Sequence, residues 1–441
     1  MISISSFKAV INNPSFKLSF YYLLVIGSLK AIQFSANSFL AVTLPITEFG
    51  FFSMLSSYQV AAATFGSIGI IESLSGQLKN NNVFSKGDKV IFRKFTFLLI
   101  LLSSLTLFFF LIVIYFSNYK SSFFYLYVLS LLVGLIISYS NIQSYFFRLN
   151  GLNFKSLFSN SIISLLYYTL VLILATYIDK VNTIVLYSSF GVFLFFILLN
   201  IFNFFYRPIK LDISEVFFYF KNIFPYIIIG FFGWISGYGI NILINELIGL
   251  KIVALFTFLL TVSTLVQLVS SSLNVVWGPK FYSYFLNDDL ILAESKNKKF
   301  YQIQIVFLSL LIVLILLIYK KFSNLIPNDL YQNRLLELAL LQISFIINIP
   351  WVHCSNYYFI SNYGNKLMKK LLFTGIVGIL IWVYFIYLYG EIGVFLGFTI
   401  NTFLKSFIIW IDSRNYWLIS NLWVEIILAS GLIILFTSII K

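Results

Sequence analysis

The sequence predicts an all-α protein, a polytopic bundle of transmembrane helices. Of its 441 residues, 60% are apolar and only 10% are charged, whereas roughly a quarter of an average soluble domain is charged. Stretches of about 20 apolar residues, the length that a helix needs to cross hydrocarbon, follow one another almost from end to end. Strands of a transmembrane barrel would be only about 10 residues long, with alternating apolar and polar side chains. Helices are therefore the expected spanning elements.

Twelve segments have the length and composition of membrane spans, and a thirteenth apolar run follows them. The first half contains segments 16–41, 48–78, 92–117, 123–147, 156–178 and 182–206, and the second contains 223–247, 252–277, 300–319, 335–360, 371–389, 392–411 and the run 417–440. We therefore expect two six-helix halves, residues 1–206 and 223–412, joined by a cytoplasmic linker, residues 207–222. Residues 413–441 form an additional C-terminal helix in this scheme.

The distribution of Lys and Arg predicts the orientation in the membrane. The net charge is +14, and 20 of the 29 basic residues lie in alternate connections, against seven in the intervening ones. Because cytoplasmic loops carry the excess of positive charge, the N-terminus is predicted to be cytoplasmic. Basic proteins often bind nucleic acid, but this alternation assigns the charge to topology, and no nucleic-acid partner is expected. The first apolar segment is longer than a signal-peptide core and is expected to remain as an anchor.

The sequence offers little for enzymatic chemistry. One cysteine, Cys354, allows no intramolecular disulfide and no cysteine metal cluster, and one histidine excludes a histidine-rich metal site. No phosphate-binding loop, dinucleotide fingerprint or nucleophile elbow is present. The connections, none longer than about 25 residues, leave no room for a soluble catalytic domain. We therefore expect a protein that is not an enzyme and has no cofactor or metal.

A weak internal repeat supports the division into halves. Three polar residues of the first span recur in the seventh at a uniform offset of 208, and each triplet lies at i, i+3 and i+7 on one helical face. The triplets are Lys30, Gln33, Asn37 and Tyr238, Asn241, Asn245. This pattern favours two halves of the same orientation, with chance matching between apolar helices as the alternative.

Two short motifs resemble a known family. One is the run Leu44-Pro45-Ile46-Thr47-Glu48-Phe49-Gly50-Phe51-Phe52-Ser53, followed by Gly69 and a basic loop from Lys79, and the other is Trp277-Gly278-Pro279-Lys280-Phe281-Tyr282. Both are similar to polysaccharide transporters, the Wzx-type O-antigen flippases. These belong to the multidrug/oligosaccharidyl-lipid/polysaccharide (MOP) exporter superfamily, which includes the multidrug and toxic-compound extruders (MATE). Such flippases usually have twelve spans, and the run after Tyr416 departs from that count.

The resemblance implies a MATE-like fold and a role in building a surface polysaccharide such as the O-antigen of lipopolysaccharide. The substrate it implies is an oligosaccharide linked to undecaprenyl pyrophosphate. The protein would move this substrate from the cytoplasmic to the periplasmic leaflet of a bacterial inner membrane by alternating access. Membrane lipids and other polysaccharide assembly proteins are the expected partners.

Lys30 is the first candidate for binding such a substrate. It lies about 20 Å from either end of its span, too far for its side chain to reach an interface. A charge at that depth generally faces a cavity or a partner. With Gln33 and Asn37 it would form a polar stripe in the bundle interior, suited to a phosphate and sugar hydroxyls. The alternative is a structural lysine between helices.

Further polar residues of the spans are candidates for the same cavity. Lys405 shares a helical face with Asn401 at i, i+4. Two roles for Lys405 are equally expected, a second contact to an anionic substrate and a structural role between helices. Asn241 and Asn245 enter as repeat counterparts of the first stripe. Gln267 and Asn274 belong to an uncharged stripe on the eighth span that also contains Ser263 and Ser270.

Two titratable residues are candidates for coupling transport to an ion. His353 follows Pro350, which should kink the tenth span and free a carbonyl, although a lone membrane histidine is more often a packing residue. Glu72 lies near the inner end of the second span, where it could pair with a cytoplasmic lysine or bind a coupling cation. Gly230, Gly233 and Gly237 mark one face of the seventh span, for close packing or for bending.

Two other functions remain open. A multidrug exporter of the same superfamily should carry acidic rather than basic cavity residues, because its usual substrates are organic cations. A membrane polysaccharide polymerase or ligase should carry a large periplasmic loop, and the sequence contains none.

Overall fold

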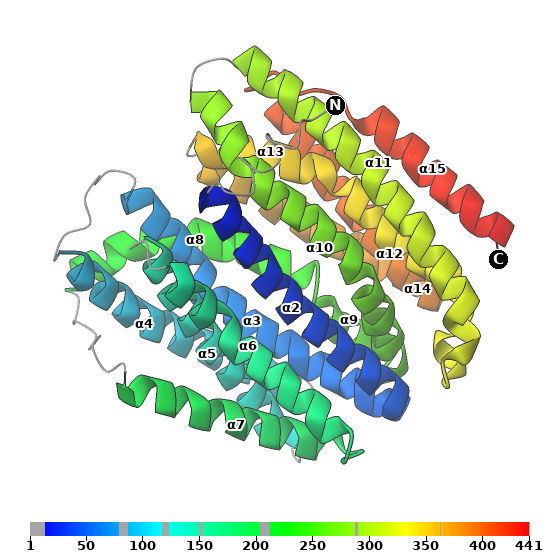
Figure 1. Cartoon of the computed structure of the whole chain (residues 1–441), viewed down its shortest axis with the longest axis horizontal. Coiled ribbons are helices and arrows are strands. Elements are labelled where there is room, and N and C mark those ends of the chain that lie inside the picture. The colour runs from blue at the N-terminus through cyan, green and yellow to red at the C-terminus, as the bar shows by residue number, and fades with distance from the viewer. Residues whose placement is uncertain are drawn as a thin grey trace. The chain divides into compact units, whose positions relative to one another are not determined.

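The computed structural model describes residues 14–78, 87–116, 123–149, 153–202, 212–286, 290–361 and 363–440. These residues form helices and connecting turns, with no strand among them (Figure 1). The first elements are α2 (Pro14–Thr43), α3 (Ile46–Leu78), α4 (Gly87–Phe116), α5 (Phe124–Leu149), α6 (Asn153–Ala175), α7 (Val181–Phe202) and α8 (Ile213–Ile235). They are followed by α9 (Ile240–Leu247), α10 (Leu250–Leu286), α11 (Leu290–Phe322), α12 (Leu335–Ile347), α13 (Ile349–Ile360), α14 (Gly364–Ser413) and α15 (Trp423–Ile440). The predicted all-helical class is confirmed.

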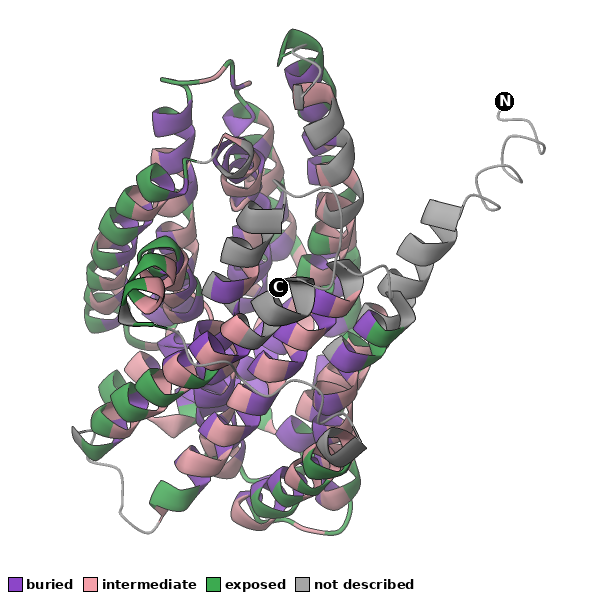
Figure 2. Ribbon diagram, turned by 90° about the vertical axis from the view of Figure 1, so that its left-hand side faces the viewer, coloured by how far each residue is buried: buried purple, intermediate pink, exposed green. Residues whose placement is uncertain are grey.

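Nine helices in the described part of the chain are long and apolar enough to cross a membrane. Their outer faces expose large apolar side chains, as on α11, where Ile303, Val306 and Leu310 are more than half exposed. Figure 2 shows such exposed faces along the helices, with buried residues on the sides where helices meet. Apolar surface of this extent would promote aggregation in water, whereas in a bilayer it contacts the lipid tails. The chain is thus a multi-pass membrane protein.

Two expected interruptions of the spans are present. The predicted segment 335–360 divides into α12 and α13 at Asn348, because Pro350 has no N–H to donate and its ring crowds the carbonyl of Ile346. The 50-residue α14 contains a non-helical residue, Gly390, with φ 55°. That left-handed conformation favours glycine. The break separates the two arms that correspond to the predicted segments 371–389 and 392–411.

Two other expectations are wrong. The segment 223–247 is not one helix, because α8 ends at Ile235 and a turn over residues 236–239 precedes α9. Gly237 and Gly239 lower the helix propensity there, and the Gly239 N–H bonds back to the Trp234 carbonyl at 2.9 Å. The predicted loop 278–299 is helical except for residues 287–289, which lie outside the described residues. Charged residues such as Lys296 suit a helix that extends beyond the hydrocarbon.

The chain forms two compact units. Unit 1 contains Met1–Phe39 and Tyr58–Gly230, and unit 2 contains Leu40–Ser57 and Phe231–Lys441. Unit 2 therefore includes a segment of α2 and α3 that a division by sequence halves would place in the N-terminal half. The division into residues 1–206 and 223–412 stays a prediction.

An apolar cluster and an ion pair hold unit 1 together. Ile70, Leu98, Ile142 and Ile223, from α3, α4, α5 and α8, belong to one buried cluster. Lys94 Nζ lies 2.6 Å from Glu215 Oε1 and ties α4 to α8. The hydrogen bond to Glu215 raises the pKa of the Lys94 amine above its ordinary value. The ion pair is half-exposed, so the apolar cluster contributes most of the stability.

Gly134 allows α5 to approach α3 closely. A Cβ added there would lie 2.2 Å from the Gln59 carbonyl oxygen and 2.8 Å from the Ala62 Cβ. We expect Gly134→Ala to destabilise the protein by about 1 to 3 kcal/mol, as overpacking does. Thermal unfolding of the purified protein in detergent measures this. Gly27→Ala is the control, because a Cβ there meets nothing within 4 Å. Equal unfolding temperatures for the two variants would contradict the close contact.

In unit 2, α15 packs against α11 and α12 (Figure 1). The expected additional C-terminal helix is therefore present, beginning at Trp423 rather than Trp417. Its 18 residues are a candidate span, about 27 Å long at the helical rise. Whether it crosses the membrane stays a prediction.

Reporter fusions placed in the connections test the predicted topology. We expect a reporter after Asn415 to give a cytoplasmic signal, and reporters after Asp179 or Asn328 to give periplasmic signals, because the basic residues concentrate on the cytoplasmic side. A fusion after Lys441 should report periplasm if α15 spans. The opposite signals at Asn415 and Asp179 would reverse the orientation, and a cytoplasmic signal at Lys441 would leave α15 on the inner side.

Candidate functional site

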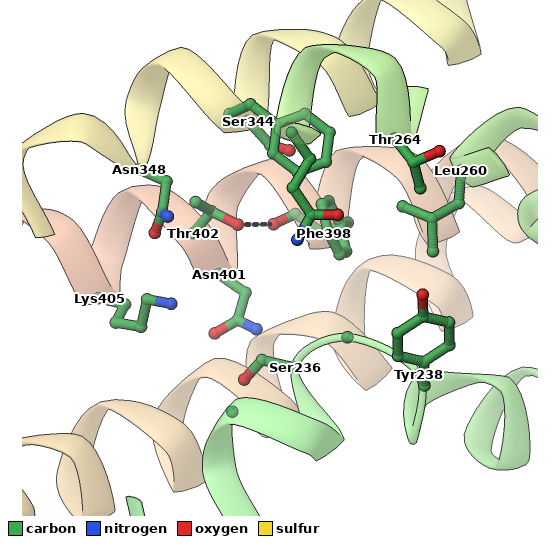
Figure 3. Close-up of a pocket in the computed structure, with 14 residues that line it drawn as sticks. Ser236, Tyr238, Leu260, Thr264, Ser344, Asn348, Phe398, Asn401, Thr402 and Lys405 are labelled. Carbon is green, nitrogen blue, oxygen red and sulfur yellow. Dashed lines mark hydrogen bonds between the residues drawn. The ribbon is translucent and has the colours of Figure 1, made fainter. Parts of the chain in front are cut away.

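Unit 2 contains a cavity of about 160 Å³, and most of the residues that line it have polar side chains (Figure 3). It lies among α10, α12, α14 and the turn between α8 and α9. Its lining residues are Gly233, Ser236, Gly237, Tyr238, Leu260, Thr264, Gln267, Ser344, Phe345, Asn348, Phe398, Asn401, Thr402 and Lys405. Ligand pockets of drug size occupy roughly 300 to 1,000 Å³, so this cavity holds one chemical group, such as a phosphate or part of a sugar.

Lys405 is the one charged residue among those that line the cavity. It is half-buried, and in the described part of the chain its amine pairs with no carboxylate. Its Nζ lies 5.1 Å from the centre of the Trp351 ring, a cation–π contact. Figure 3 shows the amine pointing into the space bordered by Asn348 and Asn401. The cavity is therefore electropositive.

Two asparagines supply amide groups beside this amine. Asn401 lies one turn before Lys405 and is 4% exposed. It fits because Gly378, on the other arm of α14, has no side chain, and a Cβ there would lie 1.9 Å from Asn401 Oδ1. Asn348 stands at the break between α12 and α13, and its buried Oδ1 has no hydrogen-bond partner in the described structure. An unpaired buried polar atom costs free energy that a ligand can recover.

Two helix breaks of unit 2 contribute to the cavity. Ser236, Gly237 and Tyr238 come from the turn between α8 and α9, and Asn348 from the break between α12 and α13. Discontinuous helices of this kind form substrate sites in transporters, because their unwound backbone offers polar groups within the membrane.

The structure brings together some of the residues predicted for the cavity. Asn401, Lys405 and Gln267 line it. Asn241 is not among the lining residues, because it is 1% exposed and its Nδ2 donates to Ser57 Oγ at 3.1 Å. Asn245 of α9 and Asn274 of α10 are not among the lining residues either. Tyr238, noted in the sequence only as a repeat counterpart, does line the cavity.

The stripe predicted around Lys30 belongs to unit 1. Lys30 is exposed in unit 1, and its Nζ donates to Gln33 Oε1 at 3.1 Å. Gln33 Nε2 in turn donates to the Tyr168 hydroxyl at 3.1 Å. Asn37 is half-buried. The position of a residue along a span gives its depth but not the direction it faces, which depends on the neighbouring helices.

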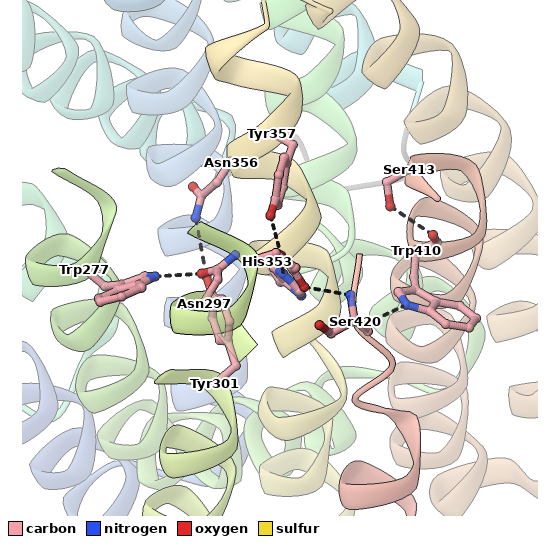
Figure 4. Close-up of polar contacts among 10 residues, drawn as sticks. Trp277, Asn297, Tyr301, His353, Asn356, Tyr357, Trp410, Ser413 and Ser420 are labelled. Atoms are coloured by element: carbon pink, nitrogen blue, oxygen red, sulfur yellow. Dashed lines mark hydrogen bonds and ion pairs between the residues drawn. The ribbon is translucent and has the colours of Figure 1, made fainter. Parts of the chain in front are cut away.

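A buried cluster of polar groups surrounds His353 (Figure 4). The His353 ring is fully buried, and its Nε2 lies 3.2 Å from Glu294 Oε2. The Tyr357 hydroxyl donates to the same carboxylate oxygen, and the Ser420 N–H donates to Glu294 Oε1 at 2.7 Å. Glu294 therefore joins α11, α13 and the connector before α15. The second coupling candidate, Glu72, has its side chain outside the described residues.

Sequence reasoning missed Glu294, which it placed in a loop. The signal was present as a polar stripe at i, i+3, i+7 and i+10 on one face of α11, namely Glu294, Asn297, Tyr301 and Gln304. All four are less than 9% exposed. Trp277 Nε1 donates to Asn297 Oδ1 at 2.7 Å, and Gln304 Nε2 donates to Ser270 Oγ at 2.8 Å. The stripe thus binds α10 to α11.

Comparison with solved structures identifies the fold. A multidrug-resistance MATE-family transporter of the MOP superfamily, in an inward-facing conformation, matches with a TM-score of 0.63 and 14% identity over 94% of this chain and 98% of its own. The lipid II flippase MurJ, in an inward closed conformation, matches with a TM-score of 0.64 and 12% identity over 95% and 98%.

A third match is a MOP superfamily transporter from Pyrococcus furiosus, whose binding pocket is described as having reverse polarity. It has a TM-score of 0.60 and 13% identity, over 90% of this chain and 94% of its own. No protein-family model matches the sequence, and no curated protein matches it. Over nearly its whole length, the chain therefore has the fold of the MOP superfamily transporters.

Proposed function

We propose that the protein is a flippase of lipid-linked oligosaccharides and that the cavity around Lys405 binds a phosphate or a phosphate-proximal sugar of the substrate. The observation that carries the proposal is the polarity of this cavity, in which one cation stands beside amide and hydroxyl groups. A lysine attracts a phosphate as a point charge, and asparagine amides bind sugar hydroxyls. A sugar–pyrophosphate headgroup cannot cross hydrocarbon unaided, so it needs a polar route through the protein, of which this cavity would form part.

The fold supports a transporter, and among the solved structures with this fold is a lipid II flippase. The substrate that fits best is the one implied by the Wzx-like motifs, an oligosaccharide on undecaprenyl pyrophosphate. Its apolar tail would stay in lipid while the headgroup passes through the protein from the cytoplasmic to the periplasmic side of an inner membrane. Because the cavity is small, it would bind one part of the headgroup at a time.

The competing function is export of organic cations, as in multidrug transporters of the same fold. An organic cation is bound most strongly where an acidic group lies at the ligand and no basic group does. No acidic residue lines the cavity, and its one charge repels cations. The polarity therefore favours an anionic substrate.

The helix breaks provide a means of changing conformation. Gly237 in the turn and Gly390 in α14 stand where the backbone departs from a helix, and such positions absorb dihedral changes. The site must bind the headgroup with similar affinity in the inward and outward states, since a large difference would trap it on one side. His353, with its partner Glu294, is the proposed coupling group, and Glu72 is a second.

Deletion of the gene in its host tests the proposal. Surface polysaccharide should be lost, and lipid-linked repeat units should accumulate on the cytoplasmic face of the inner membrane. Loss of surface polysaccharide without accumulated units would indicate a role in their synthesis instead. Unchanged export would contradict the proposal.

Lys30 is proposed as a second phosphate ligand, in unit 1. We expect Lys30→Met to reduce export about tenfold, the effect of losing one charge-assisted hydrogen bond, and Lys30→Arg to retain part of it, because guanidinium also pairs with phosphate. Export is measured in the deletion strain and normalised to the amount of each variant in the membrane. Full export by Lys30→Met would contradict the role of Lys30 as a phosphate ligand and leave it a structural role, the hydrogen bond to Gln33.

A further inference from the structure

A second cavity of about 320 Å³ lies in unit 2 at the connector between α14 and α15. The connector residues Arg414, Tyr416 and Trp417 line it together with Tyr357 of α13. The connector joins two candidate spans, so it lies at a membrane–water boundary if both of them cross. Tyr and Trp are enriched at that level, where one side of the ring is apolar and the other is wet. Nothing in the proposed transport function uses this cavity.

The backbone of the connector is held by buried side chains on both sides. The Ser420 N–H donates to Glu294 Oε1 at 2.7 Å, and Trp410 Nε1 donates to the Ser420 carbonyl at 3.3 Å (Figure 4). The Trp417 ring lies between aromatic neighbours, 5.5 Å from Tyr357 and 4.9 Å from Tyr358 between ring centres. These contacts form the cavity wall in advance, so a ligand need not order a loose loop on binding.

The cavity carries an available positive charge. The Arg414 guanidinium lies 5.0 Å from the centre of the Trp410 ring, and in the described structure it pairs with no carboxylate. The nearby acid Asp412 is already occupied, because Tyr358 donates to its Oδ2 at 2.6 Å and Lys370 Nζ lies 2.8 Å from its Oδ1. Arg414 is thus oriented by stacking, with its N–H fork free for another partner.

A second basic residue, Lys366, adds positive charge at the connector. Lys366 Nζ lies 4.1 Å from the centre of the Tyr416 ring. The lining residue Tyr357 donates to Glu294, and that carboxylate also accepts from the Ser420 N–H and lies 3.2 Å from His353 Nε2. The accessible charge at the connector is therefore positive.

We infer that this cavity binds the phosphate of a membrane lipid headgroup, with Arg414 as its ligand and the rings of Tyr416 and Trp417 as its walls. The planar guanidinium matches phosphate oxygens in pairs. Leu290 and Leu418 line the same cavity and are 45% and 69% exposed, which gives the start of an acyl chain apolar surface. That apolar surface favours a lipid over free phosphate. The site does not depend on the transported substrate.

Native mass spectrometry of the full chain in detergent micelles tests this site. Phosphatidylglycerol is titrated against diacylglycerol with the same chains, which lacks the phosphate, and against inorganic phosphate. We expect phosphatidylglycerol to bind and diacylglycerol to bind much more weakly. Arg414→Gln should weaken phosphatidylglycerol binding about tenfold, the value of a charge-assisted hydrogen bond. Arg414→Lys should retain part of the affinity, because it keeps the charge but loses the fork.

The control is Lys321→Gln, which removes an exposed cation at the other end of α11 and should leave binding unchanged. Arg414 is exposed, so its substitution leaves the buried core intact, and equal thermal unfolding of the two variants checks this. An unchanged affinity in Arg414→Gln would overturn the inference, as would diacylglycerol binding as tightly as phosphatidylglycerol. If inorganic phosphate displaced phosphatidylglycerol at equal concentration, the site would bind a free anion, and the inference of a lipid ligand would be overturned.

Discussion

We expect Lys405→Met to reduce export of surface polysaccharide by about tenfold to a hundredfold, because one charge-assisted hydrogen bond to a phosphate is worth about that factor. Methionine keeps a long apolar side chain and removes a charge that is costly within the membrane, so insertion should be normal. Lys405→Arg should keep part of the activity, and Lys405→Glu should abolish it by repelling the headgroup. Export is measured in the deletion strain and normalised to the amount of each variant in the membrane.

The matched control for Lys405→Met is Lys369→Met on the same helix. Lys369 is exposed near the start of α14 and does not line the cavity. Its substitution should leave export unchanged. Full export by Lys405→Met at equal protein level would remove Lys405 from the mechanism and assign it to the cation–π contact with Trp351 alone.

Replacing Glu294 by alanine should lower the unfolding temperature of the purified protein by on the order of 10 °C. The carboxylate binds the His353 ring, the Tyr357 hydroxyl and the Ser420 N–H, so its loss removes a hydrogen-bond partner from two buried groups and one half-buried group. Each buried polar group left without a partner costs about 1 to 3 kcal/mol. The unfolding temperature of Glu294→Gln should lie between those of Glu294→Ala and the wild-type protein, because an amide oxygen still accepts one hydrogen bond.

Glu425→Ala is the control for Glu294→Ala. Glu425 is half-buried on α15 and accepts one hydrogen bond, from Gln302 Nε2 of α11 at 2.7 Å. Losing that single bond should cost about 1 kcal/mol or less. If both variants unfolded at the same temperature, the cluster around Glu294 would not be the element that stabilises the end of unit 2.

The helices could be predicted from the sequence because a spanning helix needs only a long apolar run, which local composition shows. The breaks at Asn348 and Gly390 were also foreseeable, since Pro350 cannot continue the hydrogen-bond ladder and the apolar run stops around Gly390. The turn at residues 236–239 was not, because its glycines occur as often in tightly packed helices. Composition alone does not separate packing from bending.

The site was harder to predict than the fold. Lys405 and Asn401 share a helical face, and that face lines the cavity. Lys30 and Gln33 also share a face, and the role of that face as a ligand site stays a prediction. Which face of an apolar helix meets a cavity depends on helices distant in sequence, and the sequence pattern does not contain that information.

Glu294 shows a different difficulty. The lysines around it, Lys296, Lys298 and Lys299, gave the segment the composition of a loop. Its burial depends on three partners from two later segments, His353 and Tyr357 of α13 and Ser420 of the connector before α15. Only the i, i+3, i+7 spacing with Asn297 and Tyr301 indicated a helix with a polar buried face.

Flipping by the purified protein in proteoliposomes is the most direct test of the proposed function. The probe is a labelled oligosaccharide on undecaprenyl pyrophosphate, and a membrane-impermeant glycosidase reports the fraction in the outer leaflet. The wild-type protein should make nearly all of the label accessible, whereas Lys405→Met should leave about half protected, as in protein-free liposomes. If the wild-type protein left that half protected but transported a cationic dye, the flippase account would be contradicted, and export of organic cations would replace it.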